Sequence, residues 1–194
     1  MKTIDVILGS ARSNSSGAGI FNYLKKNAKE LESDNGVKLN FMAIRDFDLP
    51  TFNEPLPPMG NPDRKLTGAP KKWIDNVKAG DGYLFIEPVY DNGLSGAFKN
   101  ALDYIGFETA DKPARIISYS SNAMAGQASA LALLPTLAML GMVMLPHMTM
   151  IGHIDDNFEK DGNFVSNAPS EDYYSKQLKD AVADIASYTK LLNK

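Results

Sequence analysis

The chain has 194 residues, 44% hydrophobic and 22% charged, which suits one globular domain with a large core and excludes a disordered chain. A net charge of −3 and no Lys/Arg cluster argue against nucleic-acid partners; no apolar run reaches the about 18 residues of a membrane span, and no signal peptide is evident. The lack of cysteine excludes disulfides and thiol chemistry, so we expect a cytoplasmic protein without a membrane partner.

The first predicted elements are a strand and a helix joined by a polar loop. An apolar run over residues 4–8 stops at Gly9 and predicts a buried strand. Apolar side chains then recur at helical spacing over residues 20–31, and Gly36 is expected to end this helix. The loop between them therefore lies at a helix N-terminus.

This first loop has the composition of an anion site. A helix N-terminus offers unpaired N–H groups and the positive end of the helix dipole. The loop adds hydroxyl and amide donors and one guanidinium, from Ser10, Arg12, Ser13, Asn14, Ser15 and Ser16. Because the triphosphate and dinucleotide glycine patterns are absent, a phosphate monoester fits best. The alternative is that Ser15 or Ser16 is only an N-cap and the other hydroxyls form turns.

The middle of the chain alternates strands with irregular and helical segments. Residues 37–43 alternate as a half-buried strand with a polar face typical of a sheet edge. Residues 47–70 are rich in proline, asparagine and glycine and predict a long irregular loop. A short helix over residues 71–78 leads into a central parallel strand over residues 83–86, which Pro88 ends.

The second half continues this alternation. After a turn at residues 91–93 we expect a helix over 94–105, a strand over 114–119, a helix after Gly126 through Leu140, a strand over 143–150 and a closing helix over 168–193. The helix before Leu140 is apolar on nearly every face. It is therefore expected to be buried both on the sheet and against a partner chain.

Five strands alternating with helices predict an α/β fold: a single domain, residues 1–194, with a five-stranded parallel sheet in the order 2-1-3-4-5 and helices on both faces. Ligands of such sheets bind at the carboxyl ends of the strands, where the strand order reverses. The first loop is therefore expected to meet the loops that follow the third and fourth strands.

These three loops resemble those of the NADPH-dependent FMN reductase family. The first matches a Gly-Ser-x-Arg-x-x-Ser motif at residues 9–15, and the third, with Ala125-Gly126, corresponds to a Gly-Gly pair that opens a helix. A Leu-Gly-x-x-x-Leu-Pro run into the last strand is repeated at residues 140–146. The second loop resembles the flavin loop of the family at Pro88, Tyr90, Gly96, Lys99, Asn100, Ala101 and Asp103.

Several positions depart from the family pattern. Val89 replaces a glutamate, Asp91 an asparagine and Ser95 a proline. Gly93 replaces a serine, Ala125 replaces a glycine, and Ser16-Gly17 stands where the family has an asparagine. The changes at residues 89 and 91 lie where a flavin ring would sit, so they bear on substrate and redox potential more than on FMN binding.

The resemblance implies a flavodoxin-like three-layer sandwich that binds FMN and uses NADPH or NADH as electron donor. The implied enzyme is an NAD(P)H-dependent flavin oxidoreductase of the FMN reductase or quinone reductase type. It would take hydride onto bound FMN and pass electrons to a small acceptor: a quinone, free flavin, azo compound or metal oxyanion. No catalytic side chain is expected, because the chemistry takes place at flavin N5. The resemblance also implies a homodimer or homotetramer.

The predicted cofactor-binding residues lie in the three loops. A flat isoalloxazine needs an apolar slot and backbone donors, which a loop with Tyr90, Asn92-Gly93 and Gly96 can supply. The full set is Ser10, Arg12, Ser15, Ser16, Pro88, Val89, Tyr90, Asp91, Asn92, Gly93, Ser120, Ser121, Ala125 and Gly126.

Other candidates are interpreted structurally, and two alternative functions remain open. Lys99, Asn100 and Asp103 are interpreted as a solvated helix face with a Lys99–Asp103 pair. No metal site is expected: the methionines between His147 and His153 are interpreted as core residues.

The alternatives are a flavodoxin-like FMN electron carrier without its own NAD(P)H site, and an interaction module that binds no flavin. Flavin absorbance and steady NAD(P)H oxidation discriminate among the three.

Overall fold

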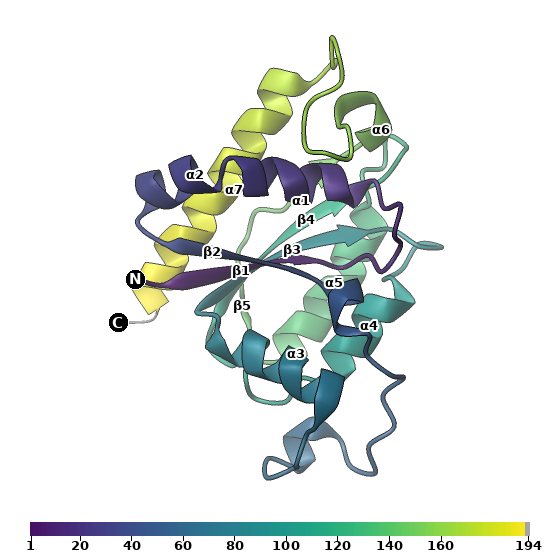
Figure 1. The fold of residues 1–194 in the computed structure, drawn as a ribbon, viewed down its shortest axis with the longest axis vertical. Coiled ribbons are helices and arrows are strands. Elements are labelled where there is room, and N and C mark those ends of the chain that lie inside the picture. The colour runs from purple at the N-terminus through teal and green to yellow at the C-terminus, as the bar shows by residue number, and fades with distance from the viewer. Residues whose placement is uncertain (193–194) are drawn as a thin grey trace.

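The computed structural model describes residues 1–192, which form one parallel sheet between two layers of helices (Figure 1). The strands are β1 (Thr3–Leu8), β2 (Lys38–Ala43), β3 (Gly82–Pro88), β4 (Pro113–Tyr119), β5 (Val143–Met144) and β6 (Thr149–Ile151). The α-helices are α1 (Gly17–Lys26), α2 (Ala28–Asn35), α3 (Gly68–Ala79), α4 (Gly96–Asp103), α5 (Gln127–Met139), α6 (Ile154–Asn157) and α7 (Glu171–Leu192). Two short 3-10 helices, η1 (Ile44–Phe47) and η2 (Pro58–Gly60), lie in the connection after β2.

The strand order β2-β1-β3-β4-β5 confirms the expected topology. Residue Val6 of β1 pairs with Phe41 of β2 on one side and with Leu84 of β3 on the other. The strand order therefore reverses between β1 and β3, where the connections leave in opposite directions. The first loop follows β1 at this point.

The expectation of one last strand over residues 143–150 is wrong. Two short strands replace it: β5 pairs with the start of β4 and β6 with its end. Pro146 lies between them and has no N–H to donate to a sheet ladder. The sheet of the described residues accordingly has six strands rather than five.

The predicted first helix is also divided. Asn27 separates α1 from α2, with φ −92° and ψ 8°, and its side-chain amide donates to the Tyr23 carbonyl at 2.8 Å. The same carbonyl also accepts from the Asn27 N–H at 3.1 Å, so the backbone hydrogen bonding continues through the division. Gly36 ends α2 in the left-handed conformation, as expected. The closing helix begins at Glu171, and its expected end at residue 193 lies outside the described residues.

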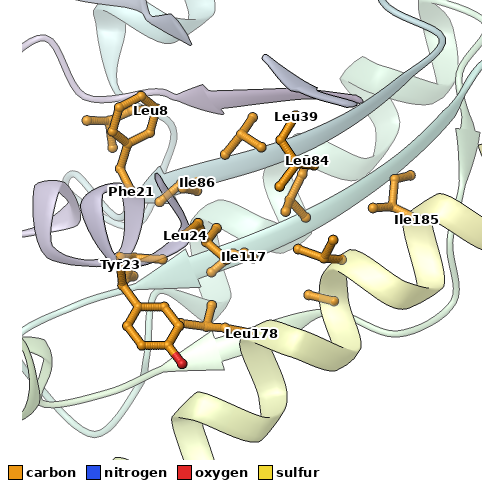
Figure 2. Close-up of a cluster of buried hydrophobic side chains, with 14 of the residues drawn as sticks. Leu8, Phe21, Tyr23, Leu24, Leu39, Leu84, Ile86, Ile117, Leu178 and Ile185 are labelled. Atoms are coloured by element: carbon orange, nitrogen blue, oxygen red, sulfur yellow. The ribbon is translucent and has the colours of Figure 1, made fainter. Parts of the chain in front are cut away.

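Each face of the sheet has its own apolar core. Helices α1, α2 and α7 cover one face, where Leu24, Leu84 and Leu178 pack together (Figure 2). Helices α3, α4 and α5 cover the other face, on which Trp73 is fully buried and donates from Nε1 to the Ala101 carbonyl at 2.9 Å. These two layers hold the carboxyl ends of the strands in fixed relative positions.

The long connection after β2 is anchored to α4. Asn100 donates from Nδ2 to the Pro50 carbonyl at 2.8 Å, and its Oδ1 accepts from the Phe52 N–H at 2.8 Å. The interpretation of Asn100 as part of a solvated face is therefore wrong. The expected Lys99–Asp103 ion pair is present.

No helix within residues 1–192 is both long enough and apolar enough to cross a bilayer. Within the same residues, no three histidine, cysteine, aspartate or glutamate side chains are grouped so that they could hold a metal ion.

Candidate functional site

The first loop leaves the sheet where β1 meets β3. The Gly9 N–H donates to the Ile86 carbonyl at 2.9 Å, so the loop starts beside the end of β3. A Cβ at Gly9 would overlap with Glu87 Oε2 and lie 3.1 Å from the Phe98 ring. Only glycine lets the backbone pass this close.

The N-terminus of α1 has no side-chain cap. Ser16 occupies the N-cap position, but its hydroxyl donates to Asp155 Oδ1 at 2.5 Å instead of accepting from the helix backbone. The Ser15 hydroxyl lies 2.9 Å from the Tyr119 hydroxyl. The interpretation of Ser15 or Ser16 as only an N-cap is therefore wrong. The positive end of the helix dipole remains available to a ligand.

Arg12 lies at the tip of this loop, exposed to solvent. Among residues 1–192, its guanidinium makes no hydrogen bond or ion pair, whereas Arg45 Nη1 donates to the carbonyls of Arg12 (3.2 Å) and Ser13 (3.3 Å). Arg45 thus fixes the loop backbone. The Arg12 side chain retains all its donors for an anion.

The three predicted loops border one cavity of about 380 Å³. This volume falls within the range of small-molecule sites, about 300–1,000 Å³. Of the predicted cofactor-binding residues, the structure brings together Arg12, Ser15, Ser16, Pro88, Val89, Tyr90, Ser120 and Ser121 as lining residues.

The other predicted residues lie around this cavity without lining it. Ser10 is fully buried beneath the loop, with its Oγ 3.4 Å from the Tyr90 hydroxyl. Asp91 and Asn92 form the tip of a two-residue hairpin turn with φ of 47° and 61°, closed by hydrogen bonds between Tyr90 and Gly93. Asp91, Asn92 and Gly93 are thus set back from the lining.

Ala125 and Gly126 shape the third loop. Both have positive φ, 52° and 73°, and the Ala125 carbonyl accepts from Ser118 Oγ at 2.8 Å. A Cβ at Gly126 would lie 2.7 Å from the Tyr119 carbonyl oxygen. They form the tight turn from β4 into α5 and, like the hairpin tip, do not line the cavity.

Four lining residues escaped the sequence analysis: Tyr119, Asn122, Ile154 and Asp155. Tyr119 ends the predicted fourth strand, so its position at the carboxyl edge was a usable signal. Ile154 and Asp155 arrive from beyond β6, because the Ile154 N–H donates to the Ser120 carbonyl at 3.1 Å. No local pattern indicated that contact.

Glu87 and Ser95 form hydrogen bonds that connect the second loop to the first. Glu87 is fully buried, and its Oε1 accepts from the Ser95 N–H at 2.8 Å. Ser95 Oγ donates to the Gly9 carbonyl at 2.7 Å, which links the second loop to the first. A proline at residue 95, as in the family pattern, would have neither donor. Burial raises the pKa of Glu87 to about 9, so this carboxyl is neutral at physiological pH.

The Tyr119 hydroxyl is also held in its protonated form. Burial raises the pKa of Tyr119 to about 12, and the hydrogen bond with Ser15 lowers it less than burial raises it. The cavity therefore contains neutral hydroxyl donors, one unpaired guanidinium and the Asp155 carboxylate. This set fits a ligand with a phosphate at one end and hydroxyl groups beside it.

The sheet order and the cavity at its reversal point define the flavodoxin-like class of α/β proteins. The fold is similar to that of the flavoenzyme NAD(P)H:(acceptor) oxidoreductase FerB from Paracoccus denitrificans, with a TM-score of 0.74 and 22% identity over 99% of both chains. At that identity the likeness concerns the fold alone.

Residues 2–156 match the model of the NADPH-dependent FMN reductase family, and the chain belongs to this family. It is 35% identical over 123 residues to the NAD(P)H-dependent FMN reductase ntnL of Nectria sp, covering 62% of this chain and 61% of the relative. It is 27% identical over 129 residues to a quinone reductase of Pseudomonas putida, covering 64% and 63%. The chain thus spans less than two thirds of either relative.

Proposed function

We propose that this chain is an NAD(P)H-dependent flavin oxidoreductase that acts as one flavodoxin-like FMN-binding domain and reduces a small acceptor. The observation that carries the proposal is the unpaired Arg12 guanidinium beside an uncapped helix N-terminus, in a cavity at the strand reversal. Family membership supports the same cofactor. Bound FMN would supply hydride acceptance from NADPH or NADH and electron transfer to a quinone, free flavin, azo compound or metal oxyanion.

In this proposal the first loop holds the phosphate. Arg12 supplies charge-assisted hydrogen bonds at the positive end of α1, and Ser15 supplies a hydroxyl donor. Ser16 also lines this end of the cavity, but its hydroxyl proton is donated to Asp155. Ser10 acts from beneath: its Oγ accepts from the Arg12 N–H at 3.4 Å and positions the loop. Asp155 carries a like charge to phosphate, so its proposed role is to accept hydrogen bonds from the ribityl hydroxyls beside it.

The second and third loops border the ring in this proposal. Pro88 and Val89 give the cavity an apolar wall, and Tyr90 lies beside them. Asp91, Asn92 and Gly93 form the turn that keeps this wall in place, while Ser120 and Ser121 supply polar groups to the lining. Ala125 and Gly126 support the third loop. No side chain is assigned a catalytic role.

The first experiment is a visible spectrum of the protein after FMN is added and the excess removed, followed by NADPH or NADH without oxygen. Retained yellow colour that bleaches is the expected result. Retained colour that neither nucleotide bleaches would favour the electron carrier. If no flavin is retained, an NADPH-oxidation assay with free FMN separates FMN used as a substrate from an unrelated ligand.

A variant tests the phosphate assignment. Arg12→Met is expected to weaken FMN binding by about 10- to 100-fold, the cost of losing charge-assisted hydrogen bonds. Riboflavin has the same ring but no phosphate, so its affinity is expected to stay within about twofold. Lys65→Met removes a cation of the long loop outside the site and serves as the control. Equal losses for both flavins would refute the assignment.

We further propose a cytoplasmic homodimer or homotetramer. Helix α5 supports assembly, because Leu131 and Met139 are 50% and 74% exposed on the side away from the sheet. Met139 also borders a hollow of about 450 Å³ beside Pro57 and Pro58. Leu131→Glu is expected to lower the mass measured by light scattering, while Leu192→Glu, at an exposed apolar position of α7, is expected to leave it unchanged. The absence of cysteine supports the cytoplasmic location.

A further inference from the structure

A buried tyrosine at the end of β4 borders the cavity beside Ser15 of the first loop. Tyr119 is the last residue of β4, is only 5% exposed and borders the cavity with Ser15. Its ring enters the space beside the first turn of α1: a Cβ at Gly17 would overlap with its hydroxyl and lie 2.5 Å from its Cζ. The first turn of the helix lacks a side chain where the tyrosine ring lies.

The Ser15 and Tyr119 hydroxyls together carry two protons that can be donated in hydrogen bonds. Ser15 Oγ and Tyr119 Oη lie 2.9 Å apart, so one of their two protons is used in the bond between them. The second proton remains for a ligand or for Ser10, whose hydroxyl also hydrogen-bonds with that of Tyr119. Because burial keeps the tyrosine protonated, that second donor persists across the physiological pH range. A hydroxyl pair of this kind is polarised, and its outer proton makes a stronger hydrogen bond.

We propose that Tyr119 is a further phosphate-site residue, whose hydroxyl forms with that of Ser15 a paired donor to the phosphate of FMN. This inference rests on the proposed function. It assigns β4 a part in phosphate binding in addition to the first loop, and it explains why the first residue of α1 is glycine. The phosphate is then held from two strands on opposite sides of the strand β3.

The test compares FMN with riboflavin in Tyr119→Phe, which removes the hydroxyl and retains the ring. Titration by flavin fluorescence is expected to show about tenfold weaker FMN binding and an unchanged riboflavin affinity. Tyr83→Phe is the matched control: it removes another buried hydroxyl, which donates to the Val77 carbonyl at 2.7 Å on the other face of the sheet. That control is expected to leave both affinities unchanged, and similar thermal unfolding midpoints of the two variants show that the fold is retained.

A double-mutant cycle examines the pairing. Because Ser15 and Tyr119 form one donor unit, Ser15→Ala with Tyr119→Phe is expected to weaken FMN binding less than the product of the single effects. Multiplicative effects would overturn the pairing.

Three outcomes in the single variant overturn the role of Tyr119: unchanged FMN affinity, tighter FMN binding, or equal weakening of FMN and riboflavin. A different result, measured on the wild-type protein, would contradict the proposed function itself. A wild-type protein that does not distinguish FMN from riboflavin has no phosphate site of this kind. A wild-type protein that prefers FMN, with the whole preference retained in Tyr119→Phe, refutes only the role of Tyr119.

Discussion

Glu87 makes the stability of this protein depend on pH, and Glu87→Gln is expected to remove the contribution of this residue. The carboxyl is fully buried, Oε1 accepts from the Ser95 N–H, and Oε2 has no hydrogen-bond partner among residues 1–192. Glutamine has the same shape, keeps the acceptor for Ser95 and cannot ionise. The variant therefore isolates the effect of the proton.

The direction and size of this pH dependence follow from the pKa of Glu87 in the unfolded chain and its pKa in the folded protein. In the unfolded chain the carboxyl ionises near 4.5, whereas in the folded protein burial raises the pKa to about 9. Between these values the unfolded state releases a proton that the folded state keeps, so the free energy of unfolding falls as pH rises. Each pH unit costs about 1.4 kcal/mol, which gives about 4 kcal/mol between about pH 5 and pH 8.

Urea unfolding followed by circular dichroism, without flavin, measures this difference. The stability of Glu87→Gln relative to wild type is expected to rise by about 4 kcal/mol over that pH range. Glu171→Gln, at an exposed position of α7, controls for the loss of one negative charge. A relative stability of Glu87→Gln that is the same at both pH values would show that Glu87 does not bind the proton, and the burial argument would be refuted.

Two further predictions concern Asp5 and Arg64. Burial raises the pKa of Asp5 to about 7 from 3.8, so the free energy of unfolding of the wild type is also expected to fall between about pH 4 and pH 7. Over this range, urea unfolding of Asp5→Asn is expected to show a pH-dependent change that is smaller by about 3–4 kcal/mol. The same dependence of stability on pH in the variant and the wild type would refute this. Arg64 is buried between Glu54 (3.2 Å) and Glu108 (3.5 Å). Arg64→Met is therefore expected to lower the free energy of unfolding by about 3 kcal/mol and to speed proteolysis within residues 47–70. Cleavage of the variant at the wild-type rate would contradict that role.

Much of the fold could be predicted because hydrophobic periodicity records which side of an element is buried. The continuous apolar run of β3 identified a central strand, and the alternation of β2 identified an edge. Glycines at 9, 36 and 126 stand where the backbone must turn or pass closely, so they marked element boundaries correctly. The division at Asn27 escaped because the apolar spacing continues through it, while only the backbone angles of Asn27 depart from the helix.

By itself, the sequence determined the order of the elements and the three loops at the strand ends, since both follow from local patterns and from the handedness of parallel connections. Only the tertiary structure decided which side chains meet in the cavity. Asp155 reaches Ser16 across 139 residues of sequence, and Tyr119 meets Ser15 across 104. Such contacts depend on how layers pack, which no local window of residues records. For the same reason Glu87 reads as an ordinary charged residue in the sequence, and only its burial beneath Gly9 and Ser95 makes it neutral.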